Sequence, residues 1–276
     1  GTVRVSGEIS SQYTSALLFA APLTGEEIII EVTGDMKSKP PIRQTLHVLR
    51  EAGITVETDD ALRRFRIPGG QHYGPRHYTV PGDYPGAAAI MAAAAVVDSD
   101  VTIERLQEAD EQGEREAVAV LKAMGADITH EGGRVRIRGG RPLHGGVFDG
   151  DRFTDAVPAL TGAATAADGV TIFENVENLR YKECDRISDY RTELNRIGAT
   201  VAEERTKLIV TGQPDGIAGG TEADSRIDHR VIMGLTIAAL RAHQPVLIKE
   251  AQHVAKSYPA FFADLRSLGA RIEAME

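Results

Sequence analysis

The sequence is short of cysteine, of net positive charge and of long apolar runs. Cys184 is the single cysteine in 276 residues, which excludes an internal disulfide and a cysteine-rich metal site. The formal net charge of −9 argues against a general nucleic-acid binder. No apolar run reaches membrane-spanning length and no signal peptide opens the chain, so we expect a cytoplasmic protein without a membrane partner.

Motifs for metals and nucleotides are absent as well. The His, Asp and Glu residues lack the clustered spacing of a metal site, and we expect neither a metal nor a cofactor. The glycine pairs at 139–140 and 219–220 lack phosphate-loop and dinucleotide patterns and are typical of turns. The composition, 42% hydrophobic and 26% charged, is that of a globular protein with one large domain or two small ones.

The sequence contains an internal repeat. A helix end of the form Leu-x-x-apolar-Gly recurs at intervals of about 72 residues, and a β-patterned run follows it each time. Glycine is expected at such an end because it adopts the left-handed conformation without steric cost. The helix ends lie at residues 49–53, 121–125, 194–198 and 265–269, and Arg271-Ile272 is the β-patterned run of the last repeat.

A second helix, rich in small apolar residues, repeats with the same period. We expect it over residues 10–21, 85–97, 155–167 and 228–242, with a strand after each copy. Helices so rich in Ala and Gly are usually buried, because their backbones can approach closely. Each unit therefore reads β-α-β-α-β-β, a small α+β layer that needs neighbours to cover its buried helix. Three such units close into one domain, and the chain has four.

Charge gathers in residues 178–186, where five of nine residues are charged although apolar runs flank the segment. If the chain is helical from 180 to 198, Lys182, Glu183 and Arg186 share one helix face. A cation, a carboxylate and a guanidinium together suit an anionic substrate that must also exchange a proton. The alternative is a solvated helix start with internal salt bridges. Cys184 has no apparent His partner, which argues against a nucleophile.

Other polar residues stand where helices are expected to begin. Ser10, Ser11 and Gln12 open the first buried helix, where free N–H groups favour an anion. The alternative there is an ordinary serine N-cap. Asp155 and Asp228 open the third and fourth buried helices, where an Asp normally acts as a cap.

Cations at helix starts are less expected, because the helix dipole disfavours positive charge at that end. Lys182, Arg230 and Lys256 all stand at expected helix starts. A capping role does not explain three cations in such places, whereas an anion held among them does. His229, beside Arg230, is a candidate base but fits a structural role better.

Together these motifs resemble the family of 5-enolpyruvylshikimate-3-phosphate synthases, or 3-phosphoshikimate 1-carboxyvinyltransferases. The resemblance covers this whole chain and the C-terminal two-thirds of the family. The matching motifs are Ser-Gly-x-Ile-Ser-Ser-Gln at 6–12, Gly-Asp-x-x-Ser-Lys-Pro at 34–40, Pro-Gly-Asp at 81–83, Asp-Ala-x-Pro at 155–158, Leu-Arg-x-Lys-Glu-x-Asp-Arg at 179–186, Asp-His-Arg at 228–230 and Lys-Ser-Tyr-Pro at 256–259. Their common order and spacing make the resemblance specific.

The resemblance implies two domains, each of three β-α-β-α-β-β units, with the active site in the cleft between them. Four of the six units are present, so we expect that an N-terminal part of the same enzyme is missing. Residues 1–80 would be the last unit of the domain that mainly precedes them. Residues 81–276 would be the three-unit domain, without the strand that this domain borrows from the start of the complete chain. The complete enzyme is expected to be a monomer.

The resemblance also implies a reaction in the shikimate pathway of aromatic amino acid biosynthesis. An enolpyruvyl transferase of this family moves the enolpyruvyl group of phosphoenolpyruvate to the 5-hydroxyl of shikimate 3-phosphate and releases phosphate. The reaction is an addition followed by an elimination, without a metal or a covalent enzyme intermediate. The expected partners are therefore small anionic substrates and the missing N-terminal part of the enzyme.

By the same resemblance, Asp155 would be the base on the 5-hydroxyl and Glu183 the proton donor to the methylene carbon. Shikimate 3-phosphate would be bound by Ser10, Ser11, Gln12, Ser38, Asp155, Asn178 and Lys182, and phosphoenolpyruvate by Gln12, Arg186, Arg230 and Lys256. Pro41 stands where many relatives place an aromatic residue over the shikimate ring, so that contact is not expected. Further substrate-binding motifs belong to the missing part, and the chain alone should have an incomplete site.

Two alternatives stay open. The related UDP-N-acetylglucosamine enolpyruvyl transferases share the fold but usually work with a cysteine on a mobile loop. Here Cys184 lies in the charged segment, and Ser-Ser-Gln together with Lys-Glu-x-Asp-Arg favours the shikimate enzyme. The other alternative is a non-catalytic fragment that needs its missing N-terminal part.

Overall fold

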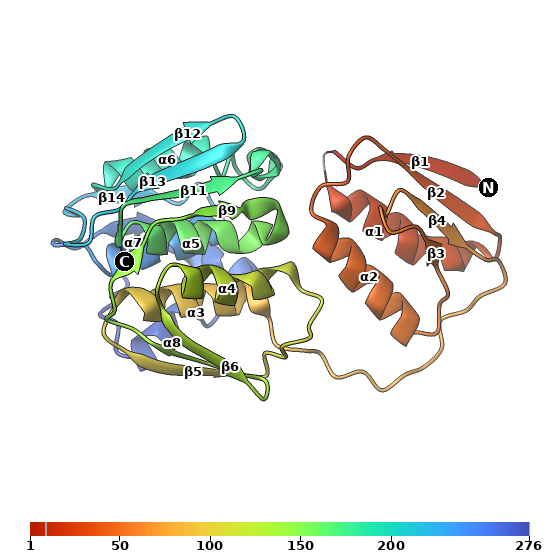
Figure 1. Cartoon of the computed structure of the whole chain (residues 1–276), viewed down its shortest axis with the longest axis horizontal. Helices are drawn as coiled ribbons and strands as arrows, with labels where there is room; N and C mark the ends of the chain where they lie inside the picture. Colours follow the sequence, from red (N-terminus) through yellow and green to blue (C-terminus); the bar gives the residue numbers. More distant parts are fainter. Residues whose placement is uncertain (9, 276) are drawn as a thin grey trace. The chain divides into compact units, whose positions relative to one another are not determined.

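The computed structural model describes residues 1–8 and 10–275 of the chain. The chain divides into two compact units (Figure 1). Unit 1 comprises Gly1–Pro81 with Ala109–Gly113, and unit 2 comprises Gly82–Glu108 with Glu114–Glu276. That these units correspond to the two domains of the enolpyruvyl transferase fold stays a prediction.

Unit 1 is one β-α-β-α-β-β repeat. It contains β1 (Thr2–Ser6), α1 (Ser11–Ala20), the short 3-10 helix η1 (Ala21–Thr24), β2 (Ile28–Thr33), α2 (Lys39–Glu51), β3 (Glu57–Thr58) and β4 (Arg64–Ile67). The strand order is β1-β2-β4-β3; β1 and β2 are parallel, and the other pairs are antiparallel. Leu18 of α1 and Leu49 of α2 pack with Ile30 and Phe65 of the sheet in one buried cluster.

The rest of the chain continues the repeat, with 3-10 helices between the main elements. From Gly82 onward it contains α3 (Tyr84–Val96), β5 (Asp100–Glu104), η2 (Gly113–Arg115), α4 (Glu116–Ala123), β6 (Asp127–Glu131), β7 (Arg134–Arg138), β8 (Leu143–His144), β9 (Val147–Asp149), η3 (Gly150–Arg152), η4 (Thr154–Ala156), α5 (Val157–Ala164), β10 (Ala167–Asp168), β11 (Val170–Glu174), η5 (Glu177–Tyr181), α6 (Ser188–Arg196), β12 (Thr200–Glu204), β13 (Lys207–Thr211), β14 (Glu222–Asp224), α7 (His229–Ala239), β15 (Leu247–Lys249), η6 (Ala251–Lys256) and α8 (Phe261–Ser267).

The sheets follow the repeat. Their strand orders are β5-β7-β6, β12-β13-β11-β9, β14-β15 and β10-β8. The pairs β9 with β11 and β14 with β15 are parallel, as β1 with β2 is in unit 1. The hairpins β6-β7 and β12-β13 are antiparallel, like β3-β4. The chain is therefore mixed helix and sheet, in agreement with the α+β class expected from the sequence.

Three helices rich in small residues form the centre of unit 2. α3, α5 and α7 pack against one another, and 12 of the 13 residues of α3 are buried. Two glycines allow α5 and α7 to approach closely, since a Cβ at Gly162 would lie 2.4 Å from the carbonyl oxygen of Gly234. This packing fixes the N-terminal ends of α5 and α7, where the candidate site lies.

The glycines expected to end helices adopt the left-handed conformation, which confirms that part of the repeat. The φ angles of Gly53, Gly125, Gly198 and Gly269 are 82°, 101°, 97° and 100°. The β-patterned run Arg271-Ile272, however, does not form a strand. Unlike its counterparts in the earlier repeats, it has no hairpin partner in residues 1–8 and 10–275, and a strand without a partner is not stable.

The expected helix from 180 to 198 is also wrong. η5 ends at Tyr181 and α6 begins only at Ser188, so Lys182, Glu183 and Arg186 lie in the loop between them. The Asp185 side chain accepts the backbone N–H groups of Ile187 and Ser188, both at 3.0 Å, and so satisfies two donors at the start of the shorter helix. A shared helix face does not bring these side chains together.

Lys256 is likewise not at a helix start. It is the last residue of η6, and α8 begins five residues later, at Phe261. Pro259 disfavours a helical conformation for Tyr258, which delays the start of α8. Of the three cations assigned to helix starts, Arg230 alone is in the first turn of an α-helix.

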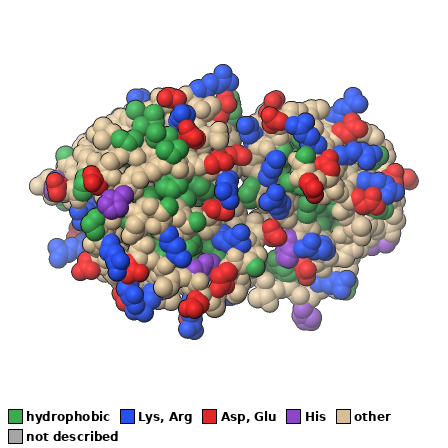
Figure 2. Space-filling view, in the orientation of Figure 1, with side chains coloured by type: hydrophobic (Ala, Val, Ile, Leu, Met, Phe, Trp, Pro, Cys, Tyr) green, Lys and Arg blue, Asp and Glu red, His purple; other side chains and the backbone are tan. Residues whose placement is uncertain are grey.

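The drawn face carries both signs of charge. In Figure 2, Lys and Arg side chains alternate with Asp and Glu side chains on each unit, without a broad basic patch on that side. The ion pairs of the surface include Arg66 with Glu27 and Glu57, and Arg136 with Asp100. Each unit therefore shows charges of both signs on its drawn side.

α1 leaves apolar surface uncovered that its counterparts in unit 2 bury. Tyr13 and Phe19 of α1 are 57% and 40% exposed, and Leu23 of η1 is 76% exposed. Each Å² of apolar surface left in water forgoes about 25 cal/mol of stabilisation. Unit 1 has one repeat to build its core, whereas α3, α5 and α7 cover one another.

We therefore expect faster hydrogen exchange in unit 1 than in unit 2 when the chain is studied alone. Amides of α1 should be less protected than those of α5 and α7, because local opening exposes little additional apolar surface. Limited proteolysis should likewise cleave first within unit 1 or the segment that follows it. Equal protection of both units in a demonstrated monomer would refute this expectation.

Candidate active site

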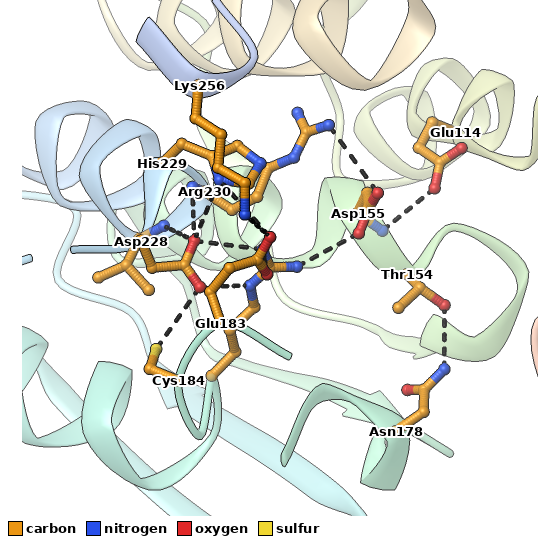
Figure 3. A network of polar contacts seen from close by, with 12 residues as sticks. Glu114, Thr154, Asp155, Asn178, Glu183, Cys184, Asp228, His229, Arg230 and Lys256 are labelled. Carbon is orange, nitrogen blue, oxygen red and sulfur yellow. Dashed lines mark hydrogen bonds and ion pairs between the residues drawn. The ribbon is translucent and has the colours of Figure 1, made fainter. Parts of the chain in front are cut away.

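Six of the predicted site residues converge within unit 2, as Figure 3 shows for most of them. They come from η4, from the loop between η5 and α6, from the first turn of α7 and from the end of η6. These residues are Asp155, Lys182, Glu183, Arg186, Arg230 and Lys256. Segments about 100 residues apart in the sequence thus meet at the N-terminal ends of two central helices.

Arg186 lies at the centre of this cluster and is almost completely buried, with 1% of its side chain exposed. Its Nε donates to Oδ2 of Asp228 at 2.8 Å, and its Nη2 donates to Oε2 of Glu183 at 2.6 Å. Its Nη1 donates to Oδ1 of Asp155 at 3.2 Å. Three carboxylates therefore compensate one buried cation, which is the condition for keeping such a charge inside a protein.

Asp228 connects this cluster to the backbone of α7. Its side chain is fully buried, and Oδ1 accepts the N–H groups of Arg230 and Val231 at 2.8 and 3.4 Å. The sequence-based interpretation of Asp228 as a cap is therefore confirmed. The second oxygen accepts from Arg186, so the cap also holds the central guanidinium.

The backbone before Asp228 is strained. Arg226 and Ile227 have φ angles of 55° and 57°, a region that a β-branched residue rarely enters. Arg226 is held there by a 2.7 Å hydrogen bond from Nη2 to Oε1 of the buried Glu193. Strain of this kind persists where surrounding contacts fix the chain, and it is common at functional sites.

Cys184 contacts the same network but is not activated. Its Sγ lies 3.5 Å from Oδ2 of Asp228, to which it donates. Burial raises the pKa of the Cys184 thiol, and the neighbouring Asp228 carboxylate raises it further. The thiol is therefore protonated at neutral pH, which argues against a nucleophile, as expected from the sequence.

Asp155 is a carboxylate within reach of solvent. Burial raises the pKa of Asp155, but Arg230, Lys182 and Arg186 together lower it below its usual value. Nη2 of Arg230 lies 3.9 Å from Oδ2, and 39% of the Asp155 side chain is exposed. An accessible, ionised carboxylate of this kind has the protonation state of a general base.

The buried guanidinium of Arg230 has a donor atom that is free to bind a further acceptor. Only 9% of its side chain is exposed, and within the described part of the chain its Nε atom has no hydrogen-bond partner. Buried donors are normally satisfied, so an unpaired one indicates that another acceptor is expected there. A guanidinium can bind a phosphate or a carboxylate through two parallel hydrogen bonds.

Glu183 is ionised in this arrangement. Its Oε1 accepts from Nζ of Lys256, and its Oε2 accepts from Arg186. Burial raises the pKa of Glu183, but the hydrogen bond from Lys256 and the charge of Arg186 outweigh it and lower the pKa to about 2. A carboxylate with so low a pKa cannot donate a proton at neutral pH while Lys256 and Arg186 remain its partners.

The lowered pKa of Glu183 predicts a stability that depends on pH. Because the pKa of about 2 lies below the ordinary value of 4.5, the ionised form stabilises the fold. Its contribution is complete above about pH 4.5 and is lost as the pH falls toward 2. Urea unfolding between pH 5 and 2.5 should therefore show a smaller acid loss in Glu183→Gln than in the unchanged chain.

The matched control for this prediction is Glu222→Gln. Glu222 pairs with Lys249 at the surface, where the two side chains are 50% and 49% exposed. An exposed pair contributes little, so this variant should keep the acid dependence of the unchanged chain. An equal acid loss in Glu183→Gln and the unchanged chain would contradict the lowered pKa.

His229 and Asn178 take supporting positions. Burial lowers the pKa of His229, and the charges of Arg230 and Arg186 lower it further, which keeps the ring neutral at pH 7. Asn178 is buried and donates to Oγ1 of Thr154 at 3.3 Å, next to Asp155 in η4. Neither contact tests the binding role that the resemblance implies for Asn178.

The other predicted residues belong to unit 1. Ser10 is the N-cap of α1, and its Oγ accepts the N–H of Gln12 at 3.2 Å, the ordinary role considered from the sequence. Ser11 is buried and Gln12 is exposed. Ser38 precedes α2 with a φ of 51°, and Pro41 lies in the first turn of that helix. Their roles in binding stay predictions.

Sequence reasoning missed Glu114 and the ion-pairing role of Asp228. Glu114 contacts the backbone of Asp155, 41 residues away. No spacing in the sequence distinguishes it from Glu111 and Glu116, which stand close to it. A carboxylate that acts through a distant backbone amide leaves no local pattern.

Comparison with known proteins decides the family. The sequence model of EPSP synthase (3-phosphoshikimate 1-carboxyvinyltransferase) matches residues 1–265. The chain belongs to the EPSP synthase family. Among curated relatives, it is 54% identical to the 3-phosphoshikimate 1-carboxyvinyltransferase of Deinococcus radiodurans over 100% of this chain, and 40% identical to that of Burkholderia pseudomallei over 98%.

Solved structures of the EPSP synthase family have the same fold. EPSP synthase from Acinetobacter baumannii superposes with a TM-score of 0.81 at 28% identity, covering 100% of this chain and 64% of the other. The enolpyruvyl transferase NikO from Streptomyces tendae is 21% identical and superposes with a TM-score of 0.73. The match covers 98% of this chain and 64% of the NikO chain, and it shows the fold alone. The chain spans 63% of the Deinococcus relative and 60% of the Burkholderia one.

Two further observations concern the described residues. None of their helices combines the length and the apolar character that crossing a membrane requires. Residues 1–8 and 10–275 also contain no group of three or more His, Cys, Asp or Glu side chains arranged to hold a metal ion.

Proposed function

We propose that this chain is the larger part of an enzyme that transfers enolpyruvyl from phosphoenolpyruvate to the 5-hydroxyl of shikimate 3-phosphate. Membership of the EPSP synthase family supports the reaction. The observation that carries the proposal is a set of ion pairs in which two carboxylates meet three cations: Asp155 and Glu183 with Arg186, Arg230 and Lys256. The chemistry needs these groups, because a hydroxyl loses a proton, a methylene carbon gains one, and the substrates are anions.

Asp155 acts as the base in this proposal. The cations around it lower the pKa of Asp155 against the effect of burial, so the carboxylate is ready to accept a proton at neutral pH. Its exposed fraction leaves room for a substrate hydroxyl to approach. Asn178 contacts Thr154 beside Asp155, and the charge of Lys182 acts on Asp155, so both residues would orient the ring of shikimate 3-phosphate.

Glu183 acts as the acid, but only after phosphoenolpyruvate binds. Lys256 and Arg186 hold Glu183 ionised in the unbound protein. An anionic substrate would compete for the same cations and so remove the main causes of the lowered pKa of Glu183. Binding and proton donation are thereby coupled: the substrate that needs the proton also releases the carboxylate to carry it.

Arg230 is expected to bind phosphoenolpyruvate. Replacing Arg230 with Ala in the full-length protein removes a buried cation with an unpaired donor, so the KM for phosphoenolpyruvate should rise by about tenfold or more. Steady-state kinetics with each substrate varied in turn measures this. An unchanged KM for phosphoenolpyruvate would show that the assignment of Arg230 is wrong.

The same assay separates the two candidate acceptors. Phosphate release should depend on shikimate 3-phosphate and not on UDP-N-acetylglucosamine. Cys184 donates a hydrogen bond to Asp228, and its raised pKa keeps the thiol protonated, which favours the shikimate acceptor. Activity with UDP-N-acetylglucosamine alone would contradict the proposed acceptor.

We further propose that the activity requires the sequence that the relatives carry outside the matched region. The chain spans 63% of the Deinococcus relative, and the uncovered face of α1 is where further repeat units would pack. α3, α5 and α7 show how three such helices cover one another in unit 2. The alternative of a non-catalytic fragment therefore applies to the chain alone and not to the full-length protein.

A further inference from the structure

Glu114 is the carboxyl group of this region for which the proposed reaction has no use. It lies in η2, directly before α4, and its side chain points toward η4 (Figure 3). Oε1 of Glu114 accepts the backbone N–H of Asp155 at 3.1 Å. The contact joins two segments of unit 2 that are 41 residues apart in the sequence.

The amide of Asp155 needs such a partner because of its place in the fold. Asp155 lies in a single 3-10 turn that leads into α5, and N–H groups at the start of a helix have no acceptor within that helix. Phe153, the residue at the N-cap position of this turn, makes no side-chain capping hydrogen bond. Glu114 therefore provides, from another element, the hydrogen-bond acceptor that a local Ser or Asp provides at an ordinary helix N-terminus.

The surroundings of Glu114 favour a neutral carboxyl group. Burial raises the pKa of Glu114, and the nearby carboxylate of Asp155 raises it further. The hydrogen bond from the Asp155 amide and the charge of Arg230 lower the pKa, but the net direction is upward. The pKa of Glu114 is therefore raised, whereas that of Asp155 is lowered. A neutral carboxyl group still accepts a hydrogen bond through its carbonyl oxygen, so the contact does not require an ionised Glu114.

We propose that Glu114 is a positioning residue that fixes the backbone of Asp155 and thereby aims the Asp155 carboxylate at the substrate hydroxyl. The proposal rests on the proposed role of Asp155 as the base. Without the Glu114 acceptor the turn can rotate, and the Asp155 carboxylate loses its fixed placement against Arg186 and Arg230. Misplacing a reacting group by about 1 Å costs roughly a hundredfold in rate.

Two substitutions of nearly equal size test this. Glu114→Gln keeps an oxygen acceptor, whereas Glu114→Met keeps the apolar stem and removes the acceptor. In the full-length protein, Glu114→Met should lower kcat by about tenfold to a hundredfold with the KM for phosphoenolpyruvate changed less than about twofold. Glu114→Gln should restore kcat to within about threefold of the unchanged enzyme.

Glu116→Met is the matched control. Glu116 is two residues away and pairs with Arg152, whose side chain is 62% exposed, so its loss should leave kcat unchanged. The positioning role is overturned if Glu114→Met keeps full kcat, or if Glu114→Gln loses as much as Glu114→Met. The second result would mean that the acidic group matters and the acceptor does not.

Hydrogen exchange of the Asp155 amide gives a readout that needs no activity. Glu114→Met should speed this exchange by about tenfold or more relative to the amides inside α5, and Glu114→Gln should not. If the unchanged full-length protein shows no enolpyruvyl transfer, the proposed function fails, and this exchange still decides whether Glu114 holds Asp155. Unchanged exchange in Glu114→Met would overturn the inference whatever the activity.

Discussion

Asp155→Ala in the full-length protein is expected to lower kcat by about a hundredfold or more, with smaller changes in KM. General-base catalysis by one positioned side chain contributes about 10² to 10⁴ in rate. The carboxylate is ionised at neutral pH because Arg230, Lys182 and Arg186 lower its pKa against burial. Steady-state phosphate release with both substrates measures the effect.

Two further variants serve as controls for this prediction. Asp155→Asn keeps the size of the side chain and an oxygen for Arg186 but removes the base, so it should lose kcat as Asp155→Ala does. Asp168→Ala removes an exposed carboxylate beyond the other end of α5 and should leave kcat unchanged. An Asp155→Asn enzyme with more than about a tenth of the normal kcat would contradict the role of Asp155 as base.

Arg186→Met is expected to destabilise unit 2 by about 3–5 kcal/mol, because it leaves buried carboxylates without their cation. Arg186 is 1% exposed and Asp228 is fully buried, so water cannot replace the lost contact. Met preserves most of the apolar stem, which limits the loss of packing to the guanidinium. Urea unfolding of the chain, followed by circular dichroism, measures the difference.

Arg205→Met provides the matched comparison. Arg205 pairs with Glu177 at a similar distance, 2.8 Å, but 82% of its side chain is exposed. Exposed pairs contribute about 0–1 kcal/mol, so this variant should change stability little. A loss below about 1 kcal/mol in Arg186→Met would show that Asp228 and its neighbours do not depend on the cation.

The repeat could be predicted from short stretches of sequence, whereas much of the site could not. Helix ends such as Gly125 and Gly198 follow from local chemistry, because a left-handed residue after a helix favours glycine wherever it occurs. The small-residue helices follow from composition, since α3 and α5 are nearly all Ala, Gly and aliphatic residues. Features set by a few neighbouring residues could therefore be predicted.

The loop that carries Glu183 and Arg186 could not be predicted in the same way. Its charged residues fit a helical face, and the hydrogen bonds from the start of α6 to Asp185 form only when the loop is folded. The grouping of Glu183 with Arg186 was expected for the wrong reason: tertiary contacts with Asp228 and Lys256 hold them, not a shared helix face. Glu114 shows the same limit, because its partner is a distant backbone amide.

In the proposed function, the ion pair between Lys256 and Glu183 would couple substrate binding to proton transfer. In the unbound protein the two side chains satisfy each other, and the carboxylate stays ionised. In the proposed reaction, an anionic substrate would replace Glu183 as the partner of Lys256, which would raise the pKa of the carboxyl group and let it donate a proton.

The most direct test of this account is a phosphate-release assay with phosphoenolpyruvate and shikimate 3-phosphate. The full-length protein should release phosphate only when both substrates are present. This chain alone should be inactive, and activity should return when a separately made N-terminal part is added. A full-length protein that binds neither substrate and releases no phosphate would contradict the proposed enolpyruvyl transfer.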